Sequence, residues 1–167
     1  DTYKVKYELT KFDILKFDNY EVFYNSLPFK PSVIICVIGF LPKNNLNKND
    51  FISKNKLIQT NFVGPSLILE FFAEKYAVAN DKLSIIGISS VAGDRGRASN
   101  FLYGSAKSGF TQFLSGLRQK YYRKNIHVLT IIPGFIDTAM LKGINAPRLL
   151  ISSSDMIADK VYNGYKK

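Results

Sequence analysis

Three polar side chains in the sequence could together move a proton to or from a carbonyl group. Tyr103 and Lys107 stand four residues apart, a spacing that places both on one face of a helix. An ammonium beside a phenol favours the phenolate, so we expect Lys107 to lower the Tyr103 pKa from about 10. Such a tyrosine can exchange a proton with a carbonyl or alcohol near neutral pH, while the Ser90 hydroxyl holds the same oxygen. The hydride must come from a bound carrier, because no side chain supplies one.

Apolar runs without polar alternation predict three strands that are buried on both faces. The runs are Val33–Ile38, Leu83–Ile88 and Val128–Ile132. They are typical of parallel sheets, whose two faces are covered by helices, and Cys36 in the first run reads as a small buried hydrophobe. Ser90 follows the second run, at the strand end where open parallel sheets place their ligands.

Helical periodicity separates these strands. We expect helices over Tyr20–Leu27, from Asn61 to a break at Ala79-Asn80-Asp81, through Ala106–Tyr121, and from Ser153 or Ser154. Val5, Tyr7 and Leu9 alternate with polar residues and predict a half-buried strand, whereas the Asn- and Lys-rich stretch 43–56 predicts an exposed loop. Alternating strands and helices indicate an α/β fold with right-handed crossovers.

Composition limits the classes of protein and of site. A chain of 167 residues with 46% hydrophobic and 22% charged residues is typical of one globular domain, here residues 1–167. One cysteine excludes a disulfide framework or a cysteine-rich zinc site, and one histidine, His127, excludes two-histidine metal motifs. We therefore expect no metal, and we interpret His127 as structural.

The net charge of +10 has two interpretations. A basic surplus can indicate an anionic partner such as nucleic acid. Here the lysines are scattered along the chain, so we expect no nucleic-acid surface, which usually clusters its charge. The longest apolar run, Val33–Leu41, is far shorter than the ~20 residues that cross a bilayer.

Three motifs in order resemble the short-chain dehydrogenase/reductase family. They are Ile88–Gly93, Tyr103–Gly109 and Pro133–Thr138, and the resemblance runs from about Asp13 to the C-terminus. It implies a Rossmann-like, doubly wound parallel sheet with helices on both faces. It also implies NAD(H) or NADP(H) as cofactor, a small-molecule carbonyl substrate, and a homo-oligomer in the full-length form.

The resemblance assigns a role to each catalytic candidate. Tyr103 would protonate the carbonyl oxygen, Ser90 would orient that oxygen, and Lys107 would lower the tyrosine pKa and hold the nicotinamide ribose. Asn61 would support a water-linked proton relay, and an asparagine there could equally cap or distort its helix. The neighbouring Ser89 is interpreted as structural.

The resemblance also implies a cofactor-binding set. Its members are Asp13, Gly39, Tyr103, Lys107, Pro133, Gly134, Ile136 and Thr138. Asp13 would contact the adenine, although an acidic turn residue would look the same. The Pro133-Gly134 stretch would cup the nicotinamide, although a simple turn after a strand would look the same.

A finer likeness concerns one branch of the family. Val37–Pro42, the loop Gly93–Asn100 and Phe113–Arg118 look like the decaprenylphospho-β-D-erythro-pentofuranosid-2-ulose 2-reductases. This likeness implies that the substrate is a keto-sugar linked to a polyprenyl phosphate and used in cell-envelope synthesis. It also implies a location in the cytoplasm or at the periphery of the inner membrane. Arg95 and Arg97 could then meet a phosphate, or equally cap a dimer or a helix.

The sequence departs from the family in its first part. The glycine-rich phosphate loop is absent, and Cys36-Val37-Ile38-Gly39 stands where the family has Asn-Asn-Ala-Gly. We expect a partial domain that lacks the family's first two strands and its last. By itself the chain should bind dinucleotide weakly or not at all and be inactive, and its own first strand should pack irregularly or replace a missing one. There are two alternatives to an enzyme. The chain could be a basic interaction module for an anionic partner, or a catalytically silent partner of an intact subunit.

Overall fold

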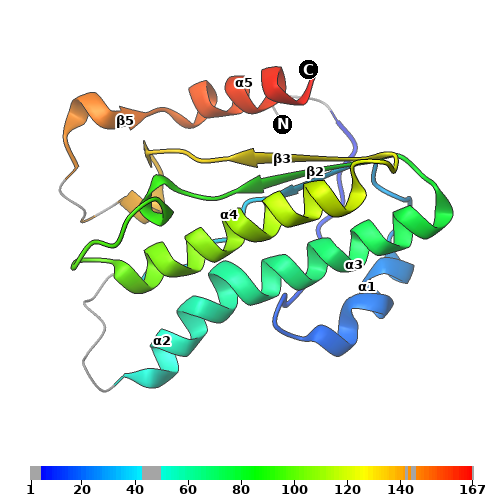
Figure 1. The fold of residues 1–167 in the computed structure, drawn as a ribbon, viewed down its shortest axis with the longest axis horizontal. Coiled ribbons are helices and arrows are strands. Elements are labelled where there is room, and N and C mark those ends of the chain that lie inside the picture. The colour runs from blue at the N-terminus through cyan, green and yellow to red at the C-terminus, as the bar shows by residue number, and fades with distance from the viewer. Residues whose placement is uncertain (1–4, 43–49, 142, 144–145, 167) are drawn as a thin grey trace.

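The computed structural model describes residues 5–42, 50–141, 143 and 146–166, and its centre is a three-stranded parallel sheet. The strands β1 (Val33–Cys36), β2 (Leu83–Ile88) and β3 (Ile126–Ile131) lie in the order β1-β2-β3 (Figure 1). Their pairing aligns Ile34 with Ile85 and Ile86 with Leu129. All three strands predicted from apolar runs are confirmed, and the arrangement is that of a partial Rossmann-like fold.

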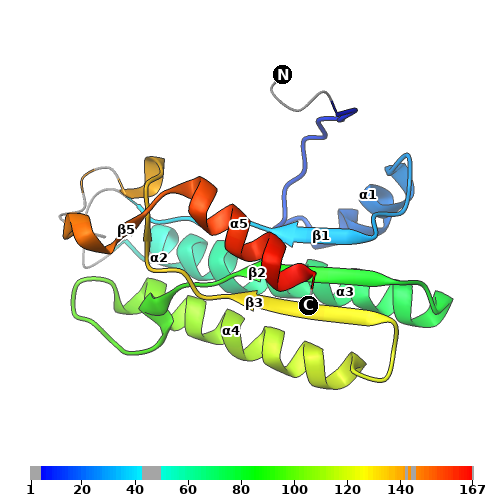
Figure 2. The same cartoon turned by 90° about the horizontal axis from the view of Figure 1, so that it is seen from above.

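Helices cover the two faces of the sheet unequally. On one face lie α2 (Phe51–Ile58), α3 (Gly64–Ala79) and α4 (Phe101–Tyr121), with α1 (Tyr20–Ser26) beside α3. On the other face, among the described residues, lies the single α-helix α5 (Ser154–Tyr165) (Figure 2). Within the part of the chain that the structure describes, no helix is both long and apolar enough to span a membrane.

The core lies between the sheet and the pair α3–α4. Phe110, Leu114 and Ile85 are fully buried there. Gly87 of β2 has no room for a side chain, because an added Cβ would overlap the Leu114 side chain. Strand and helix are therefore in direct contact at that point, and the core is closely packed on this side.

The opposite face of β1 is open, which corrects one expectation. Ile35 is 54% exposed and Val37, just after the strand, is 70% exposed. The apolar run predicted cover on both faces, yet α5 extends over the sheet without burying any of its own residues. An apolar run does not show which elements lie next to it, so the sequence of β1 could not indicate that its second face is exposed.

Two further expectations for the N-terminal half are wrong. Val5, Tyr7 and Leu9 form no strand and are 66%, 64% and 91% exposed, so the segment is irregular rather than half-buried. Residues 43–49 of the predicted loop lie outside the described residues, but the remainder of that stretch enters α2. The Asp50 carboxylate caps this helix by accepting the Ser53 N–H at 3.0 Å, a capping signal that the polar composition concealed.

Short elements complete the carboxyl end of the sheet. A 3-10 turn, Val91–Gly93, follows β2, and a small parallel pair joins β4 (Phe135–Ile136) to β5 (Ile151–Ser152). Neither of these two-residue strands was predicted. The last helix begins as expected, with the Ser153 hydroxyl accepting the Met156 N–H at 3.2 Å.

Candidate active site

Lys107 connects the carboxyl ends of the two strands β1 and β2. Its side chain rises from the second turn of α4 and is only 3% exposed. The ammonium donates to the carbonyl oxygens of Ile38 at 3.3 Å and Ile88 at 3.0 Å. Burial lowers the pKa of Lys107, and the nearby Cys36 thiol acts in the opposite direction. The Lys107 ammonium is therefore removed from water, and two of its three N–H groups are used in these two hydrogen bonds.

Ser90 and Tyr103 meet above this lysine. The Ser90 hydroxyl accepts the Ala92 N–H at 3.1 Å, which caps the 3-10 turn, and it is also hydrogen-bonded to the Tyr103 side chain. The Lys107 ammonium lies 6.0 Å from the centre of the Tyr103 ring. The structure thus brings together all three residues that the motifs linked, and the spacing of four residues does place the last two on one helix face.

Two glycines allow the Ser90 turn to lie directly on α4. An added Cβ at Gly104 would lie 2.5 Å from the Ala92 carbonyl oxygen, and one at Gly93 would lie 2.7 Å from the Ser108 nitrogen. Backbone atoms cannot give way as side-chain ends can, so only glycine permits this approach. The hydroxyl of Ser89 strengthens the same contact, since it reaches the Lys107 carbonyl oxygen at 3.0 Å and the Thr111 hydroxyl at 2.6 Å.

The pKa of Tyr103 is raised, which is contrary to the expectation that Lys107 lowers it. Burial of the phenol is the larger cause, and the hydrogen bond with Ser90 acts in the opposite direction. The Lys107 ammonium is directed at two backbone carbonyls instead of the phenol, which the i, i+4 spacing alone could not show. Tyr103 therefore holds its proton firmly in this state, as a proton donor must before it acts.

Asn61 is completely buried and lies in a π-helical turn, Gln59–Val63, between α2 and α3. Its amide nitrogen donates to the carbonyl oxygens of Phe40 at 2.7 Å and Leu57 at 2.8 Å, and its oxygen accepts the Phe40 N–H at 3.0 Å. The wider π turn and these bonds show that Asn61 distorts its helix and fixes the loop after β1. Its part in a proton relay stays a prediction.

Gly39 lies among the catalytic candidates. A Cβ at this position would lie 3.4 Å from Met140 Cε, 3.6 Å from Asn61 Oδ1 and 3.9 Å from Lys107 Nζ. The position is exposed on its remaining side. Met140, in the 3-10 turn Ala139–Leu141, was not predicted as a neighbour of Gly39, because nothing in the local sequence around a single methionine indicates which distant residue it contacts.

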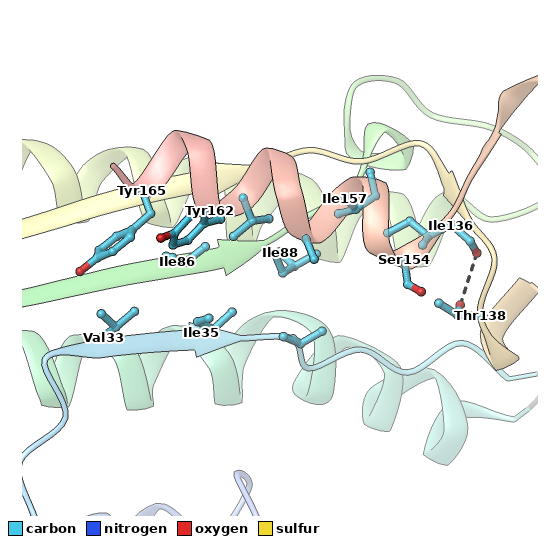
Figure 3. A pocket seen from close by; sticks show the side chains of 13 residues that line it. Val33, Ile35, Ile86, Ile88, Ile136, Thr138, Ser154, Ile157, Tyr162 and Tyr165 are labelled. Atoms are coloured by element: carbon cyan, nitrogen blue, oxygen red, sulfur yellow. Dashed lines mark hydrogen bonds between the residues drawn. The ribbon is translucent and has the colours of Figure 1, made fainter. Parts of the chain in front are cut away.

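The other cofactor candidates are spread along the carboxyl edge. The Pro133 carbonyl oxygen accepts the Val91 N–H at 3.1 Å, so it joins the end of β3 to the Ser90 turn. Gly134 follows it and is exposed. Ile136 and Thr138 line a groove under α5 and are joined by a hydrogen bond of 3.4 Å from the Thr138 hydroxyl (Figure 3).

Asp13 is placed in a turn before α1. Its carboxylate accepts the Leu15 N–H at 3.1 Å and its carbonyl oxygen accepts the Lys16 N–H at 3.1 Å. These bonds are those of an acidic turn residue, and among the described residues no contact joins Asp13 to the group around Lys107.

Three remaining candidates lie outside that group. Arg95 is exposed and Arg97 half-buried in the loop between the Ser90 turn and α4. His127 is exposed on β3, opposite Ser84 at the other end of the sheet.

Comparison with known proteins agrees with this geometry. Residues 34–149 match the family model described as short chain dehydrogenase. An uncharacterized oxidoreductase of Mycobacterium tuberculosis is 28% identical over 124 residues, which are 74% of this chain and 49% of that protein. The 3-oxoacyl-[acyl-carrier-protein] reductase FabG of Chlamydia trachomatis is 45% identical over 62 residues, which are 37% of this chain and 25% of that protein.

Solved structures share the fold at low identity. ElxO with NADP bound superposes with a TM-score of 0.77 at 20% identity, over 92% of this chain and 68% of that one. A 4-hydroxyisoleucine dehydrogenase complexed with NADH gives 0.76 at 19%, over 92% and 70%. This chain spans about half the length of the mycobacterial relative. With the family model covering most of its residues, the chain belongs to the short-chain dehydrogenase family.

Proposed function

We propose that Ser90, Tyr103 and Lys107 form the proton-transfer site of an NAD(P)H-dependent carbonyl reductase. The observation that carries this proposal is the arrangement at Tyr103. Its side chain is hydrogen-bonded to Ser90, its pKa is raised by burial, and the buried Lys107 ammonium lies 6.0 Å from the centre of its ring. A protonated phenol held beside a cation is suited to give its proton to a carbonyl oxygen.

The residues around Lys107 fit one half of a dinucleotide. Lys107 uses two N–H groups on backbone carbonyls, which leaves a third for a ribose hydroxyl. Gly39 leaves space next to that ammonium, which a side chain would reduce. When bound, the cofactor supplies the hydride. The two solved relatives named above carry NADP and NADH respectively, so we propose either cofactor for this chain.

The residues of the site would act on the substrate in a defined order. Ser90 would donate a hydrogen bond to the carbonyl oxygen and hold it near the Tyr103 hydroxyl. Tyr103 would then give that oxygen its proton, and Lys107 would stabilise the phenolate that remains. Asn61 would keep the loop after β1 in place, and with it the Ile38 carbonyl that orients Lys107. We retain Asn61 as the candidate for a water-linked relay that returns the proton.

For the substrate we propose a keto-sugar, carried on a polyprenyl phosphate and used in cell-envelope synthesis. Support comes from the loop motifs that look like that branch and from Arg95 and Arg97, which offer cations beside the site for a phosphate. The enzyme would then work in the cytoplasm or at the periphery of the inner membrane. The full-length form would pair through α3 and α4, whose Leu67 and Phe101 are 41% and 56% exposed.

A second candidate substrate is a 3-oxoacyl thioester. The similarity to the chlamydial 3-oxoacyl-[acyl-carrier-protein] reductase favours it. The keto group and the proton donor would be the same in both cases, and only the carrier of the keto group differs.

The test is reduction of both substrates by the polypeptide translated from its own start codon, with the 167-residue chain in parallel. We expect Tyr103→Phe to lower the rate by roughly 10²- to 10⁴-fold, the usual size of an acid–base contribution. Tyr122→Phe, at a tyrosine 68% exposed at the end of α4, is the matched control and should leave the rate unchanged. We expect the 167 residues alone to bind NADH and NADPH weakly and to be inactive.

Two results would overturn the proposal. One is an unchanged rate in Tyr103→Phe. The other is no reduction of either substrate by the longer polypeptide, combined with salt-dependent binding to an anionic polymer, which would instead support an interaction module.

A further inference from the structure

A cleft of about 460 Å³ lies at the amino ends of β2 and β3, where Leu83 and Ile126 are paired and both line it. The loops that lead into these two strands lie together at one end of the sheet (Figure 2). Ser90 follows the other end of β2, and the six residues of that strand span roughly 20 Å at about 3.3 Å each. The cleft is therefore distinct from the group of side chains around Lys107.

The cleft is lined by basic side chains and by no carboxylate. Lys82 comes from the loop before β2, Arg118 from α4 and Lys124 from the loop before β3. The ion pairs between described residues use three other lysines, and Asp81, the acidic neighbour of Lys82 in sequence, lies 3.7 Å from the Lys30 ammonium. Cations from three separate segments thus converge without a carboxylate counter-ion from the described part of the chain. Such a surface attracts anions.

The guanidinium of Arg118 is held in place by the strand beside it. Its Nε donates to the Val128 carbonyl oxygen at 2.8 Å, and its Nη2 donates to the Thr130 hydroxyl at 2.7 Å. A guanidinium has five N–H groups, so three of them remain for a ligand. A planar donor group that is already oriented suits two oxygens of one anion. Three cations match a phosphate, which carries about 1.5–2 negative charges at neutral pH, better than a single carboxylate.

Two tyrosine rings line the same cleft. Tyr122, directly after α4, is 68% exposed, and Tyr165, the last residue of α5, is 38% exposed. The Tyr122 ring is held by Arg123, whose Nε donates to the tyrosine hydroxyl at 2.8 Å. Exposed aromatic rings are the surfaces on which nucleobases stack. The volume of the cleft is in the range of small-molecule sites, about 300–1,000 Å³, so a single nucleotide fits it better than a polymer.

We propose that this cleft binds a nucleoside phosphate. Its phosphate groups would lie among Lys82, Arg118 and Lys124, and its base would stack on Tyr122. The site lies at the opposite end of the sheet from the proposed proton-transfer residues, and none of its side chains takes part in that chemistry. Binding here can therefore be measured whether or not the chain reduces a carbonyl.

The experiment measures the Kd of ADP and of inorganic pyrophosphate by calorimetry. The 167-residue chain and the polypeptide translated from its own start codon are titrated in parallel. We expect Lys82→Gln/Lys124→Gln to weaken the binding of both probes by about ten-fold or more, because two charge-assisted contacts are lost. Lys11→Gln/Lys16→Gln removes the same charge from two exposed lysines outside the cleft, and this matched control should leave both Kd values unchanged.

Tyr122→Leu separates the contribution of the base from that of the phosphates. It should weaken ADP by about five-fold or more and leave the Kd of pyrophosphate unchanged, since only ADP has a ring to stack.

Four results would overturn the proposal. One is an unchanged Kd of ADP in Lys82→Gln/Lys124→Gln, and another is ADP binding that only Lys107→Met weakens, which would place ADP in the cofactor site. A third is binding by the 167 residues but not by the longer polypeptide. The fourth is an oligonucleotide that binds more tightly than ADP, which would indicate a nucleic-acid surface.

Discussion

The side-chain amide of Asn61 and the backbone of Phe40 exchange two hydrogen bonds across 21 residues of sequence. The Phe40 N–H donates to Asn61 Oδ1 at 3.0 Å, and Asn61 Nδ2 donates to the Phe40 carbonyl oxygen at 2.7 Å. This pair fixes the loop after β1 on the π turn between α2 and α3. The Ile38 carbonyl oxygen that receives Lys107 belongs to the same loop, so the amide also determines where the ammonium lies.

Replacing Asn61 should therefore destabilise the fold. Asn61→Ala leaves the backbone groups of Phe40 without these partners, and buried unsatisfied groups cost about 1–3 kcal/mol in the free energy of unfolding. Urea unfolding measures the loss. Asn55→Ala, at an exposed asparagine of α2, is the control and should change stability by no more than about 0.5 kcal/mol. Equal losses in the two variants would contradict this role.

Two glycines of α4 should respond to alanine in opposite directions. Gly104→Ala places a Cβ 2.5 Å from the Ala92 carbonyl oxygen and should lower the free energy of unfolding by about 1–3 kcal/mol. Apart from its chain neighbours and the backbone of its own helix, Gly116 has no described atom within 4 Å of an added Cβ, so Gly116→Ala should raise stability by roughly 0.5–1 kcal/mol through helix propensity. Melting of the two variants side by side tests the pair, and shifts of the same sign would refute the tight contact.

Lys107 should make stability rise with pH in the alkaline range. Its pKa is lowered by burial in the folded state, whereas the unfolded chain titrates near 10.5. Between these two values the unfolded state binds more protons, so the free energy of unfolding increases with pH. Urea unfolding from pH 7 to pH 10 should show this increase, and Lys107→Met should lack it. Lys160→Met, at an exposed lysine of α5, should retain it.

Tyr20 should produce a loss of stability at higher pH. Its hydroxyl donates to the Ile14 carbonyl oxygen at 2.7 Å, and burial together with the nearby Asp13 raises its pKa to about 12. The unfolded tyrosine ionises near 10, so the stabilisation is complete below pH 10 and is lost as pH rises toward 12. Tyr20→Phe should reduce that loss relative to Tyr7→Phe, whose tyrosine is 64% exposed. If both variants lose stability in parallel with the wild type, the buried hydroxyl is not the cause.

Local patterns were sufficient for most of the elements. The three apolar runs became β1, β2 and β3, and the Ser153 cap and the break at Asn80 were found where the sequence indicated. The strand predicted over Val5–Leu9 was wrong, because alternation of apolar and polar residues shows only that a strand there could bury one face. Whether a partner is there to bury it depends on other segments. The beginning of α2 was missed because its Asp50 cap is embedded in polar residues that resemble a loop.

The sequence by itself determined which groups the site contains. The spacing of Tyr103 and Lys107 on one helix, and the position of Ser90 at a strand end, follow from local geometry that any helix and strand impose. Only the tertiary structure decided how these groups behave. Lys107 donates to two backbone carbonyl oxygens. Every residue has such an oxygen, so the residue types at positions 38 and 88 could not identify Ile38 and Ile88 as the partners. The raised pKa of Tyr103 was decided in the same way, because its larger cause is burial, which is a property of the packed chain, and the hydrogen bond with Ser90 only opposes it.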